Sequence, residues 1–567
     1  MTGSRARLFI IATVFALLGS AIVLRLGYLQ VVQYDYFSVL ATETHMRKFE
    51  IPAQRGNIFM QDRGDTTPVA MNRNRKTLYA DTRYIYEMDE VLHHLETVLG
   101  EDYSEIIHAA DGYVELEREI DYDAAMSLEE LEMSGIGLSD NYVRVYPEDS
   151  LASQVLGFVN GDGKGQYGIE EFLNDKLSGQ PGMFDARTDS RGIPLATDDN
   201  INTKPKPGAD VVLSIDRNIQ AFTEAALEEG IEKYDADSGH VIIMEADTGA
   251  VLGMANAPSF DPNQYAEVDD YSLFQNSTVS SQFEPGSGFK MFTMAAGLDD
   301  GAVSPDDTYE DTGAVNVAGS RISNVLAPQG ETSMTTVIVS SLNTGAVHVL
   351  EQLGGGEINS QAKQKLHDYF KQQFRLGEPT GIEQPGESVA SMHEPGSVGQ
   401  VEYANMAFGQ GVATTLVRMT VSIGALVNDG TMYKPRLVDY YIDGDDVVHS
   451  QPEVVADDVV SPATSRQLRE MMQEVVESGG GYGTQIEGYK IGGKTGTAEV
   501  PDPDGGYFED RYVGTFTGFA PVDDPKYVMT VRLDNPRASG YAGNQAGEIF
   551  GDIMRQLIGY GGIPPTD

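Results

Sequence analysis

An uncharged apolar run near the N-terminus constrains this chain more than any other feature of its sequence. Residues 8–24, LFIIATVFALLGSAIVL, carry no charge, while two arginines precede the run and Arg25 follows it. As a helix, this run would span about 25 Å, close to the hydrocarbon thickness of a bilayer. Tyr28 extends the segment into the membrane interface. We therefore predict a single transmembrane helix over residues 8–28.

The flanking charges also predict the orientation of this helix. Arg5 and Arg7 favour a short cytoplasmic N-terminus, residues 1–7, with the rest of the chain exported. The alternative is a cleaved signal peptide with Gly19-Ser20-Ala21 as its cleavage site. Apolar residues continue past that site to Leu24, which favours an uncleaved anchor. No second run of this length follows, so we expect a single-pass membrane protein with an extracytoplasmic body.

Composition limits the possible partners and chemistry. The chain has 39 basic and 86 acidic residues, a net charge of −47, and such a surface repels nucleic acid. The absence of cysteine excludes disulfides, thiolate catalysis and cysteine-ligated zinc. The nine histidines form no H-E-x-x-H motif. We therefore expect no nucleic-acid partner, no metal and no cofactor.

Sequence texture divides the exported part into two domains. Residues 29–205 are polar and interrupted, and we predict an N-terminal pedestal domain there, in which the paired carboxylates Glu170 and Glu171 serve domain packing. The stretch TKPKPGAD, residues 203–210, is typical of a linker. We predict a second domain over residues 206–567.

The second domain has regular patterns of strands and helices. Period-2 and period-3.6 spacing predicts, in order, a strand at 211–216, a helix at 217–234, two strands within 239–256, strands at 511–522 and 526–535, and a closing helix at 546–559. Strands at both ends with helices between them indicate one large α/β domain whose sheet takes strands from both ends of the segment.

The stretch FEPGSGFKMFTMAAGL, residues 283–298, holds the first candidate for chemistry. Pro285-Gly286 breaks any preceding helix, and the residues after it can form a new one. Ser287 then falls in the first turn, where free N–H groups and the helix dipole favour a developing negative charge. Lys290 lies on the same face and can reach the hydroxyl. It can accept the serine proton only if burial or a second cation lowers its pKa.

Two later stretches supply what this pair needs. YKIGGKTGTAEV, residues 489–500, places a lysine beside two hydroxyls on a predicted strand, which suits a substrate carboxylate; the residues are Lys494, Thr495, Gly496 and Thr497. The Lys494 charge would also lower the pKa of Lys290. The glycine leaves room for another backbone alongside. SSLNTGAV, residues 340–347, offers a relay hydroxyl at Ser341 and an amide at Asn343 that can hold lysine and substrate.

In chain order, these elements resemble the S-x-x-K, S-x-N and K-T-G signature of penicillin-binding proteins and serine β-lactamases. Ser139-Asp140-Asn141 and Ser360…Lys363 repeat two of the motifs, but neither fits the order. Surrounding stretches such as GQYGIEEFLNDKLSGQPG and YVGTFTGFAP are similar to class B, monofunctional, penicillin-binding proteins over nearly the whole chain. We see no glycosyltransferase module before the linker.

The resemblance implies a fold and a role for each matching residue. The fold is an α/β (α+β) transpeptidase domain, an antiparallel sheet flanked by helices, with an elongated mixed pedestal (dimerisation-like) domain. Ser287 would be the nucleophile, Lys290 its base, Ser341 the proton relay and Asn343 the residue that orients Lys290 and the donor peptide. Lys494, Thr495, Gly496 and Thr497 would bind the terminal carboxylate of the substrate.

The implied function is a peptidoglycan D,D-transpeptidase that cross-links stem peptides through a serine acyl-enzyme in cell division or elongation. β-Lactams would inhibit it, and a membrane-embedded glycan polymerase would be its partner. The alternatives are a D,D-carboxypeptidase, which uses water as acceptor, and a non-catalytic β-lactam sensor or division scaffold. The chain departs from the family pattern at Gly288, where a larger residue is usual, and at Val417-Arg418.

Overall fold

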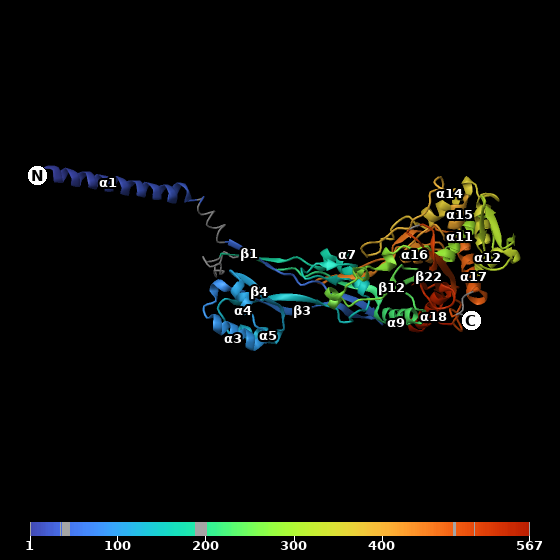
Figure 1. The fold of residues 1–567 in the computed structure, drawn as a ribbon, viewed down its shortest axis with the longest axis horizontal. Helices are drawn as coiled ribbons and strands as arrows, with labels where there is room; N and C mark the ends of the chain where they lie inside the picture. The colour runs from blue at the N-terminus through green and yellow to red at the C-terminus, as the bar shows by residue number, and fades with distance from the viewer. Residues whose placement is uncertain are drawn as a thin grey trace. The chain divides into compact units, whose positions relative to one another are not determined.

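The protein is described by a computed structural model that covers residues 2–34, 36, 46–187, 201–479, 483–503 and 505–565. Met1 of the predicted cytoplasmic tail, and residues 37–45 and 188–200 of the predicted pedestal domain, lie outside the described residues. The chain forms two compact units, Met1–Arg55 with Ser178–Gly208, and Gly56–Leu177 with Ala209–Asp567. Figure 1 colours them along the chain.

The first unit contains the predicted membrane segment. Helix α1 (Thr2–Gly27) continues into one π-helical turn, η1 (Tyr28–Val32). Residues Ala6–Val32 have a mean hydropathy of 2.3 and none of this segment is buried, so it is long and apolar enough to cross a membrane. A helix with the predicted length and apolar character is thus present. The same unit holds an antiparallel sheet of β1 (Met46–Ile51), β8 (Gly182–Arg187) and β9 (Ile201–Thr203).

The second unit begins with a mixed sheet that carries a helical insertion. Its strands are β2 (Ile58–Asp62), β3 (Asp65–Asp81), β4 (Tyr113–Ile120) and β5 (Ile136–Val145). Three helices cover β3, β4 and β5 around a small apolar core that includes Leu78 and Leu95: α3 (Met88–Leu99), α4 (Ser104–Ala109) and α5 (Tyr122–Glu129). Short elements then complete this part: α6 (Ser153–Leu156), β6 (Phe158–Val159), β7 (Gly165–Gln166), α7 (Gly168–Phe172) and α8 (Asn174–Leu177).

This sheet also takes strands from the far side of the predicted linker. Strand β10 (Asp210–Asp216) pairs in parallel with β2 and antiparallel with β18 (Val438–Asp443), giving the order β19-β18-β10-β2-β3-β4 with β19 at Asp446–His449. Position 56 requires glycine, because a Cβ there would collide with Ala209 O. The predicted strand at 211–216 is confirmed, but it extends the N-terminal sheet. The strand that follows the predicted linker therefore belongs to the same sheet as the N-terminal strands.

The C-terminal part is built on a five-stranded antiparallel sheet, as predicted. Its order is β12-β11-β23-β22-β21, from β11 (Ser238–Glu245), β12 (Val251–Ala257), β21 (Gly492–Pro501), β22 (Tyr507–Ala520) and β23 (Tyr527–Asp534). The first two strands come from the start of the domain and the other three from its end, which confirms the sequence prediction. Strand β21 lies at one edge.

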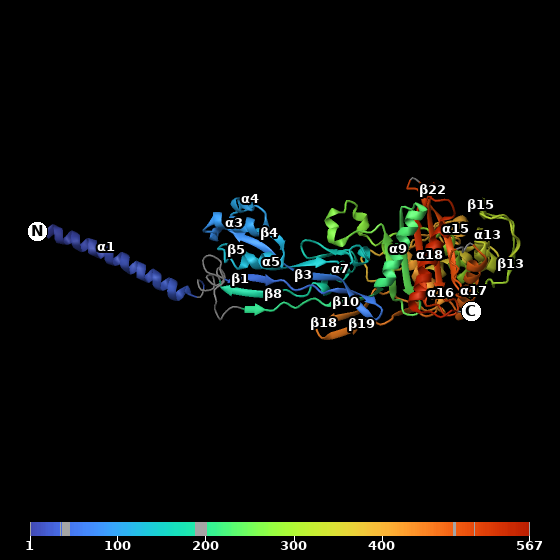
Figure 2. The ribbon, with the colours of Figure 1, turned by 90° about the horizontal axis from the view of Figure 1, so that it is seen from below.

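Helices cover both faces of this sheet. α9 (Arg217–Tyr234) and α18 (Ala542–Gly561) pack on one face, as Figure 2 shows, and α16 (Leu416–Val427) packs on the other. Successive side chains of β11 lie on opposite faces of the sheet. Val241 and Ile243 belong to the core under α9, and Ile242 and Met244 belong to the core on the other face. The predicted helix at 217–234 and the closing helix are both confirmed.

Helices and small strand pairs fill the middle of the domain. The helices are α10 (Ser277–Ser280), α11 (Lys290–Asp299), α12 (Met334–Val339), α13 (Asn343–Leu353), α14 (Ser360–Asp368), α15 (Gln400–Met406) and α17 (Pro462–Ser478). The strands are β13 (Thr308–Asp311), β14 (Ala314–Val317), β15 (Ser320–Ser323), β16 (Gly330–Ser333), β17 (Met432–Tyr433) and β20 (Val454–Ala456). Short 3-10 and π turns connect several of them: η3 (Pro262–Glu267), η4 (Tyr271–Phe274), η5 (Gly286–Phe289) and η6 (Tyr369–Gln373). A further 3-10 turn, η2 (Thr82–Tyr84), follows β3 in the N-terminal part.

A buried ion pair joins β5 to α7 in the N-terminal part. Arg144 Nε donates to Glu170 Oε1 at 2.6 Å, and the two side chains are 3% and 0% exposed. Arg144 Nη1 also donates to Gly56 O at 2.8 Å. Glu171 lies on the surface, where its carboxylate accepts from Tyr167 N at 2.7 Å. Glu170 therefore serves packing of this part of the chain, as the sequence predicted, whereas Glu171 makes only a local bond at the start of α7.

We expect Glu170→Gln to lower the free energy of unfolding of the full-length protein by about 3 kcal/mol, because it leaves the Arg144 charge buried without its counterion. Urea denaturation in detergent measures this. Glu171→Gln makes the same change at an exposed carboxylate, and we expect a loss of about 1 kcal/mol or less. Equal losses in the two variants would contradict the prediction.

Candidate active site

Ser287 lies in a tight turn that leads into a buried helix. The turn is a 3-10 helix, η5, and it runs directly into α11. Gly286 has φ +52°, and a Cβ there would collide with Thr497 O, so this position requires glycine. Ser287 itself stays partly exposed. Of the first N–H groups of the turn, Gly286 N donates to Gly409 O at 3.1 Å and Gly288 N donates to Pro285 O at 3.3 Å.

Lys290 is buried against the serine. It is 1% exposed, and its Nζ lies 3.0 Å from Ser287 Oγ, 2.6 Å from Ser341 O and 3.1 Å from Ser341 Oγ. A carbonyl oxygen can only accept, so one N–H of the lysine is committed to Ser341 O. Burial, and then the charge of Lys494, hold the pKa of Lys290 well below its ordinary value. A neutral amine in this position has its lone pair available for the proton of Ser287.

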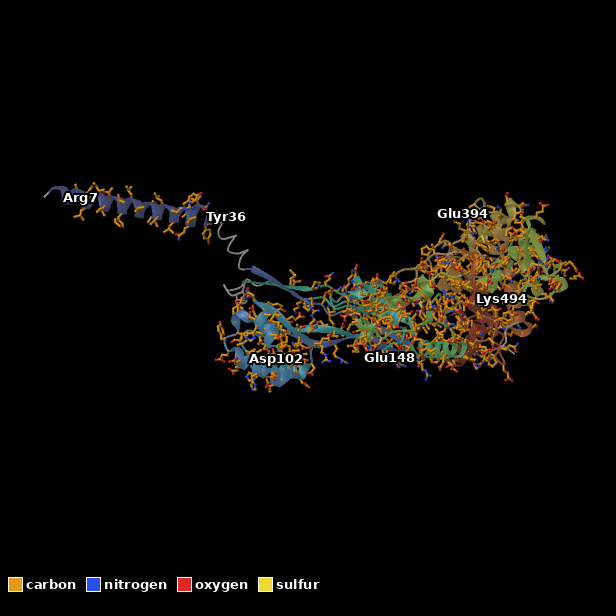
Figure 3. All side chains as sticks on the ribbon, viewed as in Figure 1. Arg7, Tyr36, Asp102, Glu148, Glu394 and Lys494 are labelled. Carbon is orange, nitrogen blue, oxygen red and sulfur yellow. The ribbon has the colours of Figure 1, made fainter. Side chains whose placement is uncertain are left out.

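Lys494 is a second buried cation at the same cluster. It is also 1% exposed, and Figure 3 labels it in the C-terminal part of the chain. Its Nζ donates to Ser341 Oγ at 3.1 Å, so this one hydroxyl lies within 3.1 Å of both lysines. Burial lowers the pKa of Lys494 to about 8. The second positive group that the sequence required is therefore beside Lys290.

The K-T-G segment runs along the edge strand β21 and packs against the serine turn. A Cβ on Gly496 would lie 2.5 Å from Pro285 O, so only glycine allows this close approach of the two backbones. Thr495 Oγ1 lies 3.4 Å from Lys494 Nζ. Thr497 Oγ1 accepts from Gly543 N at 3.1 Å, which leaves the hydrogen of this hydroxyl for another acceptor.

Asn343 occupies the first residue of α13, two residues after Ser341. Its Nδ2 donates to Ser323 O at 3.0 Å. The hydrogen bonds described for Lys290 go to Ser287 and Ser341 and do not include Asn343. The structure thus brings Ser287, Lys290, Ser341 and Lys494 together, and no described hydrogen bond joins Asn343 to Lys290.

The two competing motifs have ordinary surroundings. Ser360 is exposed at the start of α14, and Lys363 Nζ donates to Val398 O at 3.0 Å. Ser139 is exposed on β5, and Asn141 Nδ2 donates to Arg118 O at 2.8 Å. Neither serine has a described hydrogen bond to a lysine. Among the described residues, no group of three acidic or histidine side chains could hold a metal ion.

Sequence reasoning missed Glu284, three residues before the serine. Its carboxylate accepts from Gly411 N and from Tyr507 OH, each at 3.1 Å, and so connects the serine turn to a neighbouring loop and to the start of β22. Burial raises the pKa of Glu284 above its ordinary value. A single glutamate in a loop carries no spacing signal, so only the structure identifies it.

The unusual glycine at position 288 has a packing explanation. A Cβ on Gly288 would lie 3.0 Å from Met419 Cε, so the methionine methyl fills the space that a larger residue would occupy. Met419 belongs to α16, next to the second departure from the family pattern. There, Arg418 is buried and donates to Glu378 O at 2.8 Å.

The chain is similar to known proteins over nearly its whole length. Residues 239–555 match the family described as penicillin binding protein transpeptidase domain, and residues 50–213 match the penicillin-binding protein dimerisation domain. Stage V sporulation protein D of Bacillus subtilis is 33% identical over 552 residues, which cover 95% of this chain and 83% of the relative. The probable peptidoglycan D,D-transpeptidase PbpC of Pseudomonas aeruginosa is 29% identical over 571 residues, with 99% and 96% covered. The crystal structure of penicillin binding protein 3 from Mycobacterium tuberculosis, complexed with aztreonam, superposes with a TM-score of 0.71 at 26% identity, covering 92% of this chain and 98% of that chain.

We expect Gly288→Ala to change the free energy of unfolding by less than about 1 kcal/mol. Alanine stabilises the helical backbone relative to glycine, and this gain offsets the cost of displacing the flexible Met419 methyl group. Gly286→Ala places its Cβ against the Thr497 carbonyl at positive φ, and we expect a loss of about 2 kcal/mol or more. Urea denaturation of both variants checks the contrast, and equal tolerance of both changes would refute it.

Proposed function

Because the chain belongs to the class B penicillin-binding proteins, we propose that it is a membrane-anchored peptidoglycan D,D-transpeptidase that cross-links stem peptides. The observation that carries this proposal is the buried cluster in which Lys290 Nζ lies 3.0 Å from Ser287 Oγ and Lys494 lies across Ser341. β-Lactams, which resemble the acyl donor, acylate the same serine.

The proposed reaction has two acyl-transfer steps. Ser287 Oγ attacks the carbonyl between the last two D-alanines of a donor stem peptide, the C–N bond breaks, and D-alanine leaves. The acyl group remains on Ser287 as an ester. An amine of a neighbouring stem peptide then attacks this ester, forming the cross-link and regenerating the hydroxyl.

Lys290 and Ser341 move the protons in this proposal. Neutral Lys290 takes the proton from Ser287 Oγ as the hydroxyl attacks. Ser341 Oγ, 3.1 Å from Lys290 Nζ, relays a proton to the departing amine. Lys494, at the same distance from Ser341 Oγ, holds this hydroxyl in place, and its charge adds to the effect of burial in lowering the pKa of Lys290.

The edge strand supplies substrate binding. Lys494, Thr495 and Thr497 bind the terminal carboxylate of the donor, and Gly496 keeps the strand close to the serine turn. Ser287 N and Thr497 N act as the oxyanion hole, an assignment supported by the packing of Gly286 against the Thr497 carbonyl. Asn343 orients the donor peptide from the other side of the cluster.

The anchor and the domain boundaries complete the proposal. Residues 1–7 stay in the cytoplasm, residues 8–28 span the membrane, residues 29–205 form the pedestal, and residues 206–567 form the transpeptidase domain outside the membrane. The arginines before the apolar run support this orientation. A membrane-embedded glycan polymerase supplies the strands to be cross-linked. The acceptor amine distinguishes this activity from that of a D,D-carboxypeptidase, in which water takes the acyl group.

We expect a fluorescent penicillin to label the full-length protein in detergent. Ser287→Ala should abolish the labelling, because Ser287 carries the one hydroxyl among residues 286–289 of the turn. Ser360→Ala, the same change in the second S-x-x-K motif, should label like the wild type. Gel fluorescence measures both. Labelling of the Ser287→Ala variant would contradict the assignment of Ser287 as the nucleophile.

The two lysines predict a bell-shaped pH dependence of acylation. The rate rises with pH as Lys290 loses its proton, at a pH well below 10.5, the ordinary pKa of lysine, and it falls as Lys494 deprotonates near its pKa of about 8. Lys494→Gln removes the charge that repels a proton from Lys290, so we expect the acidic limb to move to higher pH. Penicillin acylation rates between about pH 5 and 10 test this. An acidic limb that stays in place, or that moves equally in Lys363→Gln, would contradict it.

A further inference from the structure

A buried carboxylate lies beside the helix that carries Asn343, outside the three motifs. Asp311, at the end of β13, is 1% exposed. Its Oδ1 accepts from Gly313 N at 3.1 Å, Asn324 Nδ2 at 2.9 Å and Thr344 Oγ1 at 2.8 Å, and its Oδ2 accepts from Gln329 N at 2.9 Å. Burial alone would raise its pKa, but these donors hold the pKa of Asp311 below its ordinary value. The carboxylate therefore stays ionised and fully paired.

This network takes the place of a helix cap on α13. The residue before the helix is Leu342, whose side chain cannot accept a hydrogen bond. Thr344 N, one of the first N–H groups of the helix, instead donates to Asn324 Oδ1 at 3.0 Å. Asn343 Nδ2 donates to Ser323 O, so both residues are held by the segment that includes Asn324. Figure 2 shows α13 beside β13, which carries Asp311, and beside β15, which ends at Ser323 directly before Asn324.

The Thr344 hydroxyl connects the two parts of the network. Its one hydrogen goes to Asp311, so Tyr309 OH, 2.8 Å away, donates to Thr344 Oγ1. Asn324 Nδ2 donates to the same oxygen at 3.0 Å. Thr344 is buried, and its methyl and hydroxyl are therefore held in one orientation.

The start of α13 needs such a restraint because Ser341 is strained. Its φ of +58° lies in the left-handed region, where a residue with a Cβ is held only by its surroundings. On one side, Lys290 Nζ binds Ser341 O at 2.6 Å and Lys494 binds its Oγ. On the other side, Leu342 leads directly into the helix that Asp311 and Asn324 hold.

We infer that Asp311, acting through Thr344 and Asn324, positions Ser341 and Asn343 for acyl transfer. Asp311 and Thr344 are positioning residues, since their described hydrogen bonds go to the strands and the helix start and not to Ser287 or Lys290. The inference rests on the proposed function of Ser287. It assigns to the β13–β16 region a role in setting the geometry of the reaction.

The test compares full-length variants in detergent by their acylation with a fluorescent penicillin. Thr344→Val removes the hydroxyl at constant shape, and we expect the acylation rate constant to fall by about tenfold to a hundredfold, because a displacement of the relay hydroxyl by a fraction of an ångström is enough. The noncovalent affinity for the penicillin should stay the same, since the carboxylate-binding residues are on β21. Thr344→Ser keeps the hydroxyl and should restore the rate.

Thr332→Val is the matched control. It also removes a buried hydroxyl, from β16, where Thr332 Oγ1 donates only to the local Gly330 O at 2.9 Å, and it should leave the rate constant at the wild-type value. A rate constant for Thr344→Val within twofold of wild type, or an equal fall in Thr332→Val, would overturn the inference.

A milder variant covers a failure of Thr344→Val to fold. Tyr309→Phe removes one donor to Thr344 and keeps the ring that stacks on His348, and we expect the rate constant to fall roughly twofold to tenfold. An unchanged rate constant in a folded Tyr309→Phe would overturn the inference. Wild-type protein that is not labelled at all would instead refute the proposed function, so the two failures are distinguishable.

Discussion

The placement of two lysines around one serine hydroxyl is the constraint on which the rest of the active domain depends. Lys290 and Lys494 are both withdrawn from water, and each has a lowered pKa. Burying two lysines side by side is unfavourable, and the cluster tolerates it because Ser341 offers its carbonyl to one lysine and its hydroxyl to both. The same arrangement keeps Lys290 neutral, which a base for serine must be. The burial that lowers the pKa of Lys290 therefore also lowers the free energy of unfolding of the protein.

The fold meets this constraint by bringing three distant segments to one edge of a sheet. The serine turn, the start of α13 and strand β21 are separated by about 50 to 150 residues, as the hydrogen bonds between them show. Close contact between the turn and the strand depends on two residues that lack a side chain, Gly286 and Gly496. The start of α13 does not depend on a glycine in this way. It is held instead by the hydrogen bond from Thr344 Oγ1 to Asp311. Glycine therefore sets the distance on one side of the site, and hydrogen bonding sets it on the other.

Sequence patterns predicted the elements of the C-terminal sheet well. The strand at 211–216 and the helix at 217–234 appear with nearly the predicted bounds because each has a clear period and a clear start, Asp216 capping the helix at Asn218 N and Ile219 N. The sequence did not predict the pairing of the strand that follows the linker. Prolines and a glycine indicated a break in the chain, but the backbone after them pairs with β2, and strand pairing across more than 150 residues leaves no local signal.

The sequence by itself determined the membrane anchor, the main elements and the three motifs, because hydrophobic period, turn residues and short spacings are local properties of the chain. The order of the motifs selected Ser287 over Ser360, but only the tertiary structure showed that Lys290 Nζ lies 3.0 Å from its serine beside a second buried lysine, while Lys363 Nζ donates to Val398 O. It also showed why Gly288 is tolerated, and it identified Glu284 and Asp311. A lysine becomes a base through burial and through charges that come from far along the chain, and neither can be read from the residues next to it.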